Sequence, residues 1–376
     1  MKLLFFISSL QCGGAERVCV TLCNHWADRG WEITLATFDD GAQPPFFPLS
    51  PAVRHVTLDL ERRSEGLIHS VTNNLRRVAL LRTFVRRERP SRILSFIDGT
   101  NVLALIAAAG TGIPVVVAER VDPAHHGIPL PWKILRRVVY RNAFAIAVQT
   151  RSIGAYFPAS WQERIALIPN PVPSMPSRSA DQAAPPGVRR SIVAMGRLER
   201  QKGFDLLIRA FASIASTRLE WDLTIFGEGS ERVALEAAIT RAGLSERIAL
   251  PGRERDAAGA LARADLFVLS SRYEGFPNAL CEAMASGLPV ISFDCPSGPA
   301  DIVRDGMDGR LVPAEDVEAL AAAMAELTGN AELRKALGVA ATAVAERFSI
   351  QRIAALWERV LRDGASAVVT PAGEAV

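Results

Sequence analysis

The sequence predicts an α/β protein made of two doubly wound domains in tandem, each with a parallel sheet. Apolar runs of four to seven residues alternate with segments of helical periodicity along nearly the whole chain. Such alternation is typical of βαβ units, whose strands are buried on both faces. A Pro-rich stretch at 170–190 interrupts the alternation once, and 376 residues are enough for two domains.

The first predicted domain spans residues 1–172. Its strands are expected at the short apolar runs 3–8, 32–38, 53–58, 93–96, 115–118, 145–149 and 165–168. Its helices are expected between them, at 15–29, 67–89, 101–109 and 131–142. We interpret the opening run as a buried strand and not a signal peptide, because no small-x-small cleavage pattern follows it. Gly and Pro interrupt every long apolar stretch, so we expect no membrane-spanning helix.

A linker is predicted at 173–190, where Pro, Ser and Ala replace the apolar periodicity. The second domain then spans 191–348, with strands expected at 192–195, 222–226, 248–250, 266–270 and 289–294. Its helices are expected at 203–216, 230–242, 257–262, 278–286, 317–326 and 331–347. A last helix at 350–362 lies in the segment 349–363, and 364–376 is expected to be a frayed tail.

Charge is spread unevenly between the two domains. Residues 1–172 carry 20 Lys and Arg against 13 Asp and Glu, a net of +7, whereas residues 173–376 carry 23 against 27, a net of −4. A nucleic-acid binder would be basic throughout, so we do not expect nucleic acid as a partner. Arg is the usual cation of this chain, because only four of the 43 cations are Lys: Lys2, Lys133, Lys202 and Lys335.

The five cysteines are an odd number without a C-x-x-C pair, which favours a reducing, cytoplasmic location. Cys19, Cys23 and His25 are close enough in sequence to raise the question of a metal site. Cys19 and Cys23 also lie four residues apart in an apolar run, and we favour two buried cysteines on a helix face over a metal site.

Glycines follow the first predicted strand, at Gly13 and Gly14 of the segment 11–17. Open parallel sheets bind ligands at the carboxyl ends of their strands, and with two such domains the natural site is a cleft between them. The two glycines allow a ligand close to the backbone and leave free N–H groups at a helix start, which suits an anion. The alternative is a tight turn without a ligand.

Two further motifs follow strands of the second domain. Arg197 and Lys202 flank a short loop after the strand 192–195, where a guanidinium and an ammonium suit a diphosphate, although they could also be solvated surface charges. The segment 271–284 follows the strand 266–270 and opens a helix near Asn278, whose N-terminus offers N–H groups to an anion or to sugar hydroxyls. Glu274 precedes this helix and Glu282 lies one turn inside it, and carboxylates suit hydroxyl-rich ligands.

In this order and context, the three motifs resemble the retaining glycosyltransferases of family 4, which have the GT-B fold. The E-x7-E pattern of Glu274 and Glu282 is the most specific element, followed by the segment 196–211. The E-R-x-D-P form at 119–123 and the segment 12–17 resemble a subgroup that builds bacterial polysaccharides and lipid-linked oligosaccharides. The resemblance also implies that the helix 350–362 crosses back onto the first domain.

The resemblance implies roles for individual residues. Arg197 and Lys202 would hold the diphosphate of a nucleotide-sugar, and Glu282 would bind its ribose. The resemblance to the subgroup favours a UDP-linked sugar. Gly13 and Gly14 would lie near the donor phosphate and the acceptor, and the base would reach Gly252 and Arg253. The donor sugar would be held by Glu274 and the adjoining backbone, that is Gly275, Phe276, Pro277, Asn278, Ala279 and Leu280.

One position departs from the family pattern. Many members carry a His after the strand that is expected here at 115–118, whereas this chain has Glu119 and Arg120 there, with His125 and His126 a few residues later. We favour Glu119 and Arg120 over the two histidines for the role of that His.

Cofactors are not expected. No Asp-x-Asp occurs in the sequence, so we expect a metal-independent transfer. The resemblance to retaining enzymes implies that the leaving phosphate accepts the proton of the acceptor, while fixed positive charge stabilises that phosphate. The alternatives are a nucleotide-sugar epimerase or a non-catalytic glycan-binding protein of GT-B shape. A phosphorylase with pyridoxal phosphate is disfavoured, because Lys202 is the one lysine near a predicted site and is better used on the diphosphate.

The basic first domain also suggests an anionic membrane that carries the acceptor. Residues 62–92 hold nine arginines, among them Arg62, Arg63, Arg76, Arg82 and Arg86, with apolar Leu75, Val78, Leu81 and Phe84 between them. Residues 132–137 form a second basic and apolar patch. Helices of this kind can lie on anionic lipid, although an ordinary helix with arginines on its wet face is the alternative.

Overall fold

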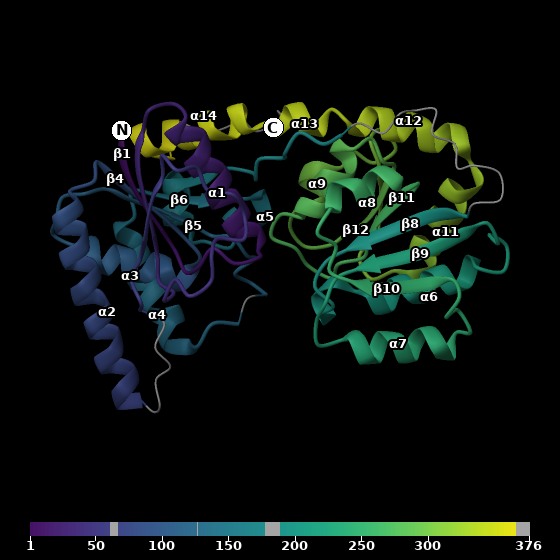
Figure 1. The fold of residues 1–376 in the computed structure, drawn as a ribbon, viewed down its shortest axis with the longest axis horizontal. Helices are drawn as coiled ribbons and strands as arrows, with labels where there is room; N and C mark the ends of the chain where they lie inside the picture. The colour runs from purple at the N-terminus through teal and green to yellow at the C-terminus, as the bar shows by residue number, and fades with distance from the viewer. Residues whose placement is uncertain (61–66, 126, 177–188, 366–376) are drawn as a thin grey trace. The chain divides into compact units, whose positions relative to one another are not determined.

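The computed structural model describes residues 1–60, 67–125, 127–176 and 189–365 (Figure 1). The chain divides into two compact units, one made of residues 1–171 with the segment from 350 onward, the other of residues 172–349. Each unit is described by itself. None of the described helices is long and apolar enough to cross a bilayer. The basic pair Arg62 and Arg63, His126 and most of the predicted linker and tail lie outside the described residues.

The sheet of the first unit has seven parallel strands in the order β3-β2-β1-β4-β5-β6-β7. Most strands are buried on both faces, as the continuous apolar runs predict. The strands are β1 (Lys2–Ile7), β2 (Glu32–Thr37), β3 (Arg54–Thr57), β4 (Arg92–Phe96), β5 (Val115–Ala118), β6 (Ala145–Val148) and β7 (Ile165–Leu167). The opening run is therefore a buried strand near the middle of the sheet, as predicted.

Helices cover both faces of this sheet (Figure 1). On one face the core is formed with α2 (Leu67–Glu88), α3 (Asp98–Ala108) and α4 (Leu130–Val139), which is followed by the 3-10 turn η1 (Tyr140–Asn142). On the other face α1 (Gly14–Ala27) packs against α14 (Ile350–Asp363). The helix α5 (Arg151–Ala155) and the 3-10 turn η2 (Ala159–Arg164) complete the unit, and neither was predicted.

The last helix belongs to the first unit although it follows the second in sequence. Trp357 of α14 is fully buried and lies 5.7 Å from Phe96 of β4, measured between ring centroids. The Arg92 side chain donates a 2.6 Å hydrogen bond from Nε to the carbonyl of Leu361. These contacts confirm that this helix returns to the N-terminal part of the chain.

The sheet of the second unit has six parallel strands in the order β10-β9-β8-β11-β12-β13. They are β8 (Arg190–Met195), β9 (Trp221–Phe226), β10 (Ile248–Gly252), β11 (Leu266–Leu269), β12 (Val290–Asp294) and β13 (Arg310–Pro313). The last of these was not predicted, because it is a four-residue edge strand with a mostly half-exposed pattern.

The helices of the second unit also form two layers. One face is covered by α6 (Phe204–Ile214), α7 (Arg232–Arg241) and α11 (Val317–Gly329), and the other by α8 (Ala257–Arg263) and α9 (Asn278–Ala285) (Figure 1). The predicted helix 331–347 is split into α12 (Ala331–Ala341) and α13 (Val344–Arg347), because the N–H groups of Thr342 and Ala343 bond to carbonyls three residues back. The short elements η3 (Arg200–Lys202) and α10 (Pro299–Ile302) complete the unit.

In each sheet the strand order reverses once, between β1 and β4 in the first unit and between β8 and β11 in the second. The crevice outside the carboxyl ends of two such strands is where open α/β sheets bind ligands. The loops that follow these four strands are therefore the places to look for a site.

Candidate active site

In the second unit, the predicted motifs follow the two strands at which the strand order reverses. Arg197 and Lys202 follow β8, and Glu274 follows β11. The Lys202 Nζ atom lies 2.6 Å from Oε1 of Glu274, with both side chains largely buried. Ser271 Oγ donates a second hydrogen bond, of 2.5 Å, to the same carboxylate oxygen. Two residues that are 72 positions apart are thus brought together as a buried ion pair.

The loops around this ion pair are also joined by Arg272. Its guanidinium donates two hydrogen bonds to Asp205, of 2.9 and 2.8 Å, one to Glu315 and one to the carbonyl of Arg200. Burial alone would raise the pKa of Asp205, but the hydrogen bonds from Arg272 lower it below its ordinary value. The backbone N–H of Arg272 bonds to the carbonyl of Gln201. Arg272 therefore fixes the turn before α6 to the loop after β11.

Gly203 is needed where these two loops meet. Its φ is +61°, and a Cβ at this position would lie 2.0 Å from the carbonyl oxygen of Ser270. Only glycine combines a left-handed backbone with so close an approach. The Ser270 hydroxyl also donates to the carbonyl of Lys202, at 2.9 Å. The Lys202 backbone is thus held against the end of β11.

The other predicted donor residues of this region are placed as follows. Arg197 is exposed, and the described part of the chain gives it no ion-pair partner. Phe276 is buried and contacts the Phe348 ring edge-on, with centroids 5.6 Å apart. Asn278 begins α9, and Glu282 is buried in its second turn. Gly275, Pro277, Ala279 and Leu280 lie in the same loop and first helical turn.

Gly252 and Arg253 lie at the end of β10, on the side of β9 away from β8. Gly252 has φ +95° and is buried, and Arg253 is exposed. Nothing in the described contacts brings these two residues to the Lys202–Glu274 pair. Their role as the place of the base stays a prediction.

Sequence reasoning missed the loop after β12. The Ser297 hydroxyl hydrogen-bonds to the backbone carbonyl of Glu274, and the N–H of Glu274 donates to the carbonyl of Pro296. Gly298 has φ +105°, and a Cβ there would lie 2.8 Å from Pro277. The signal was available in the sequence, because Cys-Pro-Ser-Gly-Pro directly follows a buried strand and leads into a helix.

In the first unit, Gly13 caps the start of α1 and Gly14 is the first helical residue. The room beside Gly13 is occupied by the chain itself, since a Cβ there would lie 2.1 Å from Oε2 of Glu16. Burial raises the pKa of Glu16, while its backbone hydrogen bond and Arg120 oppose that shift. A phosphate at this helix start would therefore meet a carboxylate that is already there.

Arg120, which follows β5, is buried with its guanidinium 4.4 Å above the ring of Phe96. It hydrogen-bonds to Asn170, which also accepts a 2.7 Å hydrogen bond from Gln149. Burial lowers the pKa of Arg120 to about 9, against the attraction of Cys19 and Glu16. Its Nε atom is buried and has no hydrogen-bond partner among the described residues.

Glu119 is buried on the opposite face of the sheet, because successive residues of an extended segment point to opposite sides. It accepts a 2.7 Å hydrogen bond from the Tyr140 hydroxyl and lies 3.7 Å from Nη1 of Arg136. Burial raises its pKa to about 7, although Arg136 and Tyr140 lower it. Glu119 and Arg120 therefore lie in different surroundings and cannot act on a ligand as a pair.

Three further residues singled out in the sequence of this unit are described. His125 is exposed and lies 2.8 Å from Asp122. Cys19 and Cys23 are fully buried on α1, as predicted, and burial together with Cys23 raises the pKa of Cys19. Over the described ranges, no three His, Cys, Asp or Glu residues are grouped so that they could hold a metal.

The comparisons with known proteins agree with this architecture. Residues 189–330 match the family model "Glycosyl transferases group 1", and residues 13–171 match the model "Glycosyl transferase 4-like domain". A Campylobacter jejuni protein is 27% identical over 96% of this chain and 99% of its own length. Its name is GalNAc-alpha-(1->4)-GalNAc-alpha-(1->3)-diNAcBac-PP-undecaprenol alpha-1,4-N-acetyl-D-galactosaminyltransferase.

Solved structures share the fold over the same extent. Sucrose-phosphate synthase from Thermosynechococcus elongatus has a TM-score of 0.83 at 19% identity, over 96% of this chain and 98% of that one. The Anabaena protein HepE, in complex with UDP and glucose, has a TM-score of 0.76 at 21% identity, over 96% and 100%. With its two parallel-sheet units and both family matches, the chain belongs to the group 1 and 4-like glycosyltransferases and has the GT-B fold.

Proposed function

We propose that this glycosyltransferase moves a hexose or an N-acetylhexosamine from a UDP-sugar to a lipid-linked glycan, with retention of configuration and without a metal. The observation that carries the donor half is the buried Lys202–Glu274 pair at the strand-order reversal of the second unit. The solved relative that is bound to UDP and glucose supports the same class of donor.

The chemistry follows from the charges of this pair. The bond from the anomeric carbon to the β-phosphate oxygen breaks, and a bond from that carbon to an acceptor oxygen forms. Lys202 and the exposed Arg197 would stabilise the negative charge that develops on the leaving diphosphate. A leaving phosphate oxygen would accept the proton of the acceptor, and Glu274 would accept hydrogen bonds from hydroxyls of the donor sugar.

The lipid-linked acceptor is supported by the Campylobacter relative, whose name contains an undecaprenyl diphosphate, and by the surface of α4. Leu130, Ile134 and Val138 recur at every fourth residue of this helix and are 68%, 58% and 45% exposed. Lys133 and Arg137 lie on the flank of this stripe and are exposed. An exposed apolar stripe with cations beside it is suited to the interface of an anionic membrane.

The structure corrects the predicted patch at 132–137 in one respect. Arg136 is buried and pairs with Glu119, because it lies two positions from Ile134 and therefore on the inner face of α4. The lipid-facing residues we propose are therefore those of the outer face.

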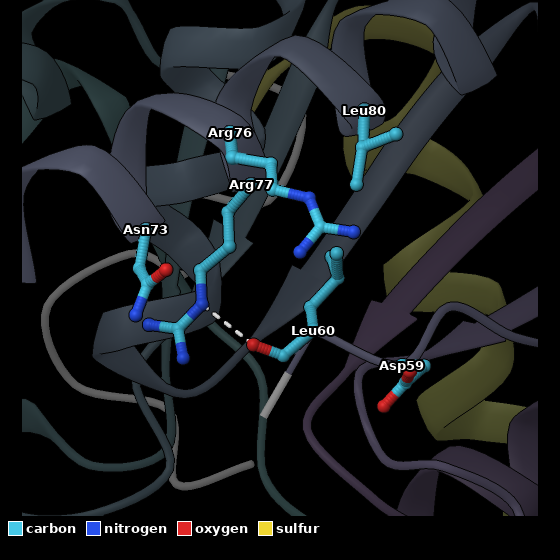
Figure 2. A pocket seen from close by; sticks show the side chains of 6 residues that line it. All are labelled: Asp59, Leu60, Asn73, Arg76, Arg77 and Leu80. Carbon is cyan, nitrogen blue, oxygen red and sulfur yellow. Dashed lines mark hydrogen bonds between the residues drawn. The ribbon is translucent and has the colours of Figure 1, made fainter. Parts of the chain in front are cut away.

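The long basic helix α2 contributes less to the proposed membrane surface than the sequence predicts. Leu81 is fully buried, and Val78 and Phe84 pack against the core, so of the four predicted apolar residues Leu75 alone, at 66%, is strongly exposed. Figure 2 shows Arg76 and Arg77 above Leu60, with the Arg77 Nε atom hydrogen-bonded to the Leu60 carbonyl. The hollow beside them has a volume of about 10 Å³, room for no more than one water. For α2, the ordinary reading of arginines on a wet face is the better one.

We therefore propose that the reaction takes place at the cytoplasmic face of a membrane, where the enzyme can reach nucleotide-sugars of the cytoplasm. All five cysteines are free in the structure, which suits a reducing compartment.

The test is a donor screen with the full-length protein. We expect UDP to raise the melting temperature more than GDP or ADP at equal concentration, because a ligand of the folded state alone stabilises it. We also expect one UDP-sugar to be consumed faster when a prenyl-diphosphate-linked glycan is present. Stabilisation by GDP alone would refute the UDP assignment, and equal consumption with and without the acceptor would refute the transfer.

A further inference from the structure

The first unit contains a cavity that none of the predicted catalytic or donor-binding residues lines. Its volume is about 200 Å³, and it lies between the start of α3 and the inner face of α4. It is lined by Asp98, Gly99 and Val102 of α3, by Ile128 and Pro129 before α4, and by Trp132 and Arg136 of α4. We propose that this cavity binds one pyranose ring of the acceptor glycan, an inference that rests on the proposed function.

The position of the cavity favours a substrate. Asp98 and Gly99 come directly after β4, one of the two strands at which the strand order of the first unit reverses, and Ile128 and Pro129 follow β5. The crevice at the carboxyl ends of such strands is the general ligand position of open α/β sheets. Asp98 lies in the first turn of α3, where a carboxylate is favoured, and its Oδ1 atom accepts a 2.7 Å hydrogen bond from Gly99.

The backbone before Asp98 is strained. Ile97 has φ +74° and ψ 137°, a region that a β-branched residue rarely adopts. Its N–H donates to the carbonyl of Ala118, which holds the turn to the end of β5. Strain of this kind gathers at ligand-binding and active sites. The strained turn is what carries Asp98 to the wall of the cavity.

The walls have the chemistry that a sugar ring requires. A pyranose has an apolar face of C–H groups and an edge of hydroxyls. Trp132 and Val102 offer apolar surface, while the Asp98 carboxylate can accept from hydroxyls and the Arg136 guanidinium can donate to them. A cavity of about 150 Å³ holds benzene, so about 200 Å³ is enough for one six-membered ring with its substituents.

The helix α4 connects this cavity with the proposed membrane surface. Trp132 and Arg136 are four residues apart and share the inner face, whereas Leu130, Ile134 and Val138 share the outer face. Arg136 is fixed on the inner side by Glu119 and by a 3.1 Å hydrogen bond to the Tyr156 hydroxyl. One helix would thus contact the lipid with one face and the sugar of the same acceptor with the other.

Binding to the cavity can be tested without the donor. Saturation-transfer NMR on the full-length protein, with methyl N-acetyl-α-galactosaminide and methyl α-glucoside as probes, should show transfer to the ring protons of at least one. Val102→Phe, which fills the cavity, should reduce that signal about fivefold or more. Ile134→Ala changes the outer face of the same helix and should leave it unchanged. No transfer in the wild type, or an equal signal in Val102→Phe, would overturn the proposal.

A second measurement covers the case in which Val102→Phe fails to fold. Asp98→Asn keeps the shape of the side chain and removes its charge. We expect it to raise the KM for the acceptor about tenfold, while hydrolysis of the donor by water stays within twofold of the wild type. An unchanged acceptor KM would overturn the proposal. If the wild type hydrolyses no UDP-sugar at all, the proposed function fails, and the NMR result still decides about the cavity.

Discussion

The two units present opposite kinds of site at the carboxyl ends of their parallel sheets. After β8 and β11, charged residues are joined to one another and to the backbone, as Lys202 is to Glu274 and Arg272 to Asp205. After β4 and β5, the loops leave an open cavity, a strained Ile97 and a buried Arg120 whose Nε atom lacks a partner in the described chain.

This contrast supports the proposal that the two units bind different ligands. A rigid set of charges suits a ligand that stays the same, such as a nucleoside diphosphate, because preorganised charges need not move during the reaction. An apolar cavity with a few polar groups on its wall suits a ligand that is chosen by shape. We therefore assign the donor to the second unit and the choice of acceptor to the first.

The largest expected effect comes from removing the charge that faces the diphosphate. Lys202→Ala should lower kcat/KM about 10²- to 10³-fold, the usual cost of one lost electrostatic stabiliser. Steady-state rates with the identified UDP-sugar measure it. Lys335→Ala, an exposed lysine of the same unit, is the control and should be fully active. A Lys202→Ala rate within tenfold of the wild type would remove the donor role of this residue.

In the first unit, the buried Glu119 makes the free energy of unfolding depend on pH. Its pKa of about 7 in the folded protein lies above the ordinary 4.5, so the folded state favours the protonated carboxyl. This contribution to stability is fully present below pH 4.5 and is lost as the pH rises to about 7, a change of about 3 kcal/mol.

Glu119→Gln removes that titration while it keeps an acceptor for Tyr140. The free energy of unfolding of the variant minus that of the wild type should therefore be about 3 kcal/mol larger at pH 8 than at pH 4.5. Urea unfolding at a series of pH values measures it. Glu163→Gln, an exposed carboxyl of the same unit, should show no such trend. A pH-independent difference for Glu119→Gln would contradict the account.

A substitution at Arg272 tests whether donor binding by the second unit depends on the rigid connection between its loops. Arg272→Lys keeps the charge but loses the paired hydrogen bonds to Asp205, because an ammonium lacks the guanidinium fork. We expect stability to fall by about 2 kcal/mol and the donor KM to rise several-fold.

The matched control for this variant is Arg310→Lys, which alters an equally paired arginine that bonds to Glu326 away from the loops. It should change stability slightly and leave the donor KM unaltered. If both variants raise the donor KM alike, Arg272 has no special positioning role.

The smallest expected effect is that of a chelator. With no Asp-x-Asp in the sequence, transfer in excess EDTA should stay within about twofold of the untreated rate. The assay needs only a desalted sample and a magnesium add-back as control. A loss of activity that magnesium restores would show that the diphosphate is held with a metal.

Much of the fold follows from the sequence, because buried parallel strands are continuous apolar runs and the helices between them are periodic. The strands β1, β5 and β11 were predicted within one or two residues at each end. The short elements β13, α5 and α10 were missed, since four or five residues carry too little periodicity.

The site was predictable where a motif follows a strand, as for Lys202 and Glu274. Contacts that are set by the tertiary fold could not be predicted from the sequence. The partners of Glu119 and Arg120 depend on which helices cover the two faces of the sheet, and the burial of Arg136 depends on the rotation of α4. The cavity beside Trp132 has no signature in the sequence, because it is made by two segments, 98–102 and 128–136, that meet only in the folded chain.

The assignment of donor to one unit and acceptor to the other is tested most directly by measuring donor hydrolysis and glycosyl transfer side by side. In Trp132→Ala, transfer at low acceptor concentration should fall about tenfold, whereas hydrolysis of the UDP-sugar by water should stay at the wild-type rate. In Lys202→Ala, both rates should fall together. Equal losses of hydrolysis and transfer in Trp132→Ala, or intact hydrolysis in Lys202→Ala, would contradict it.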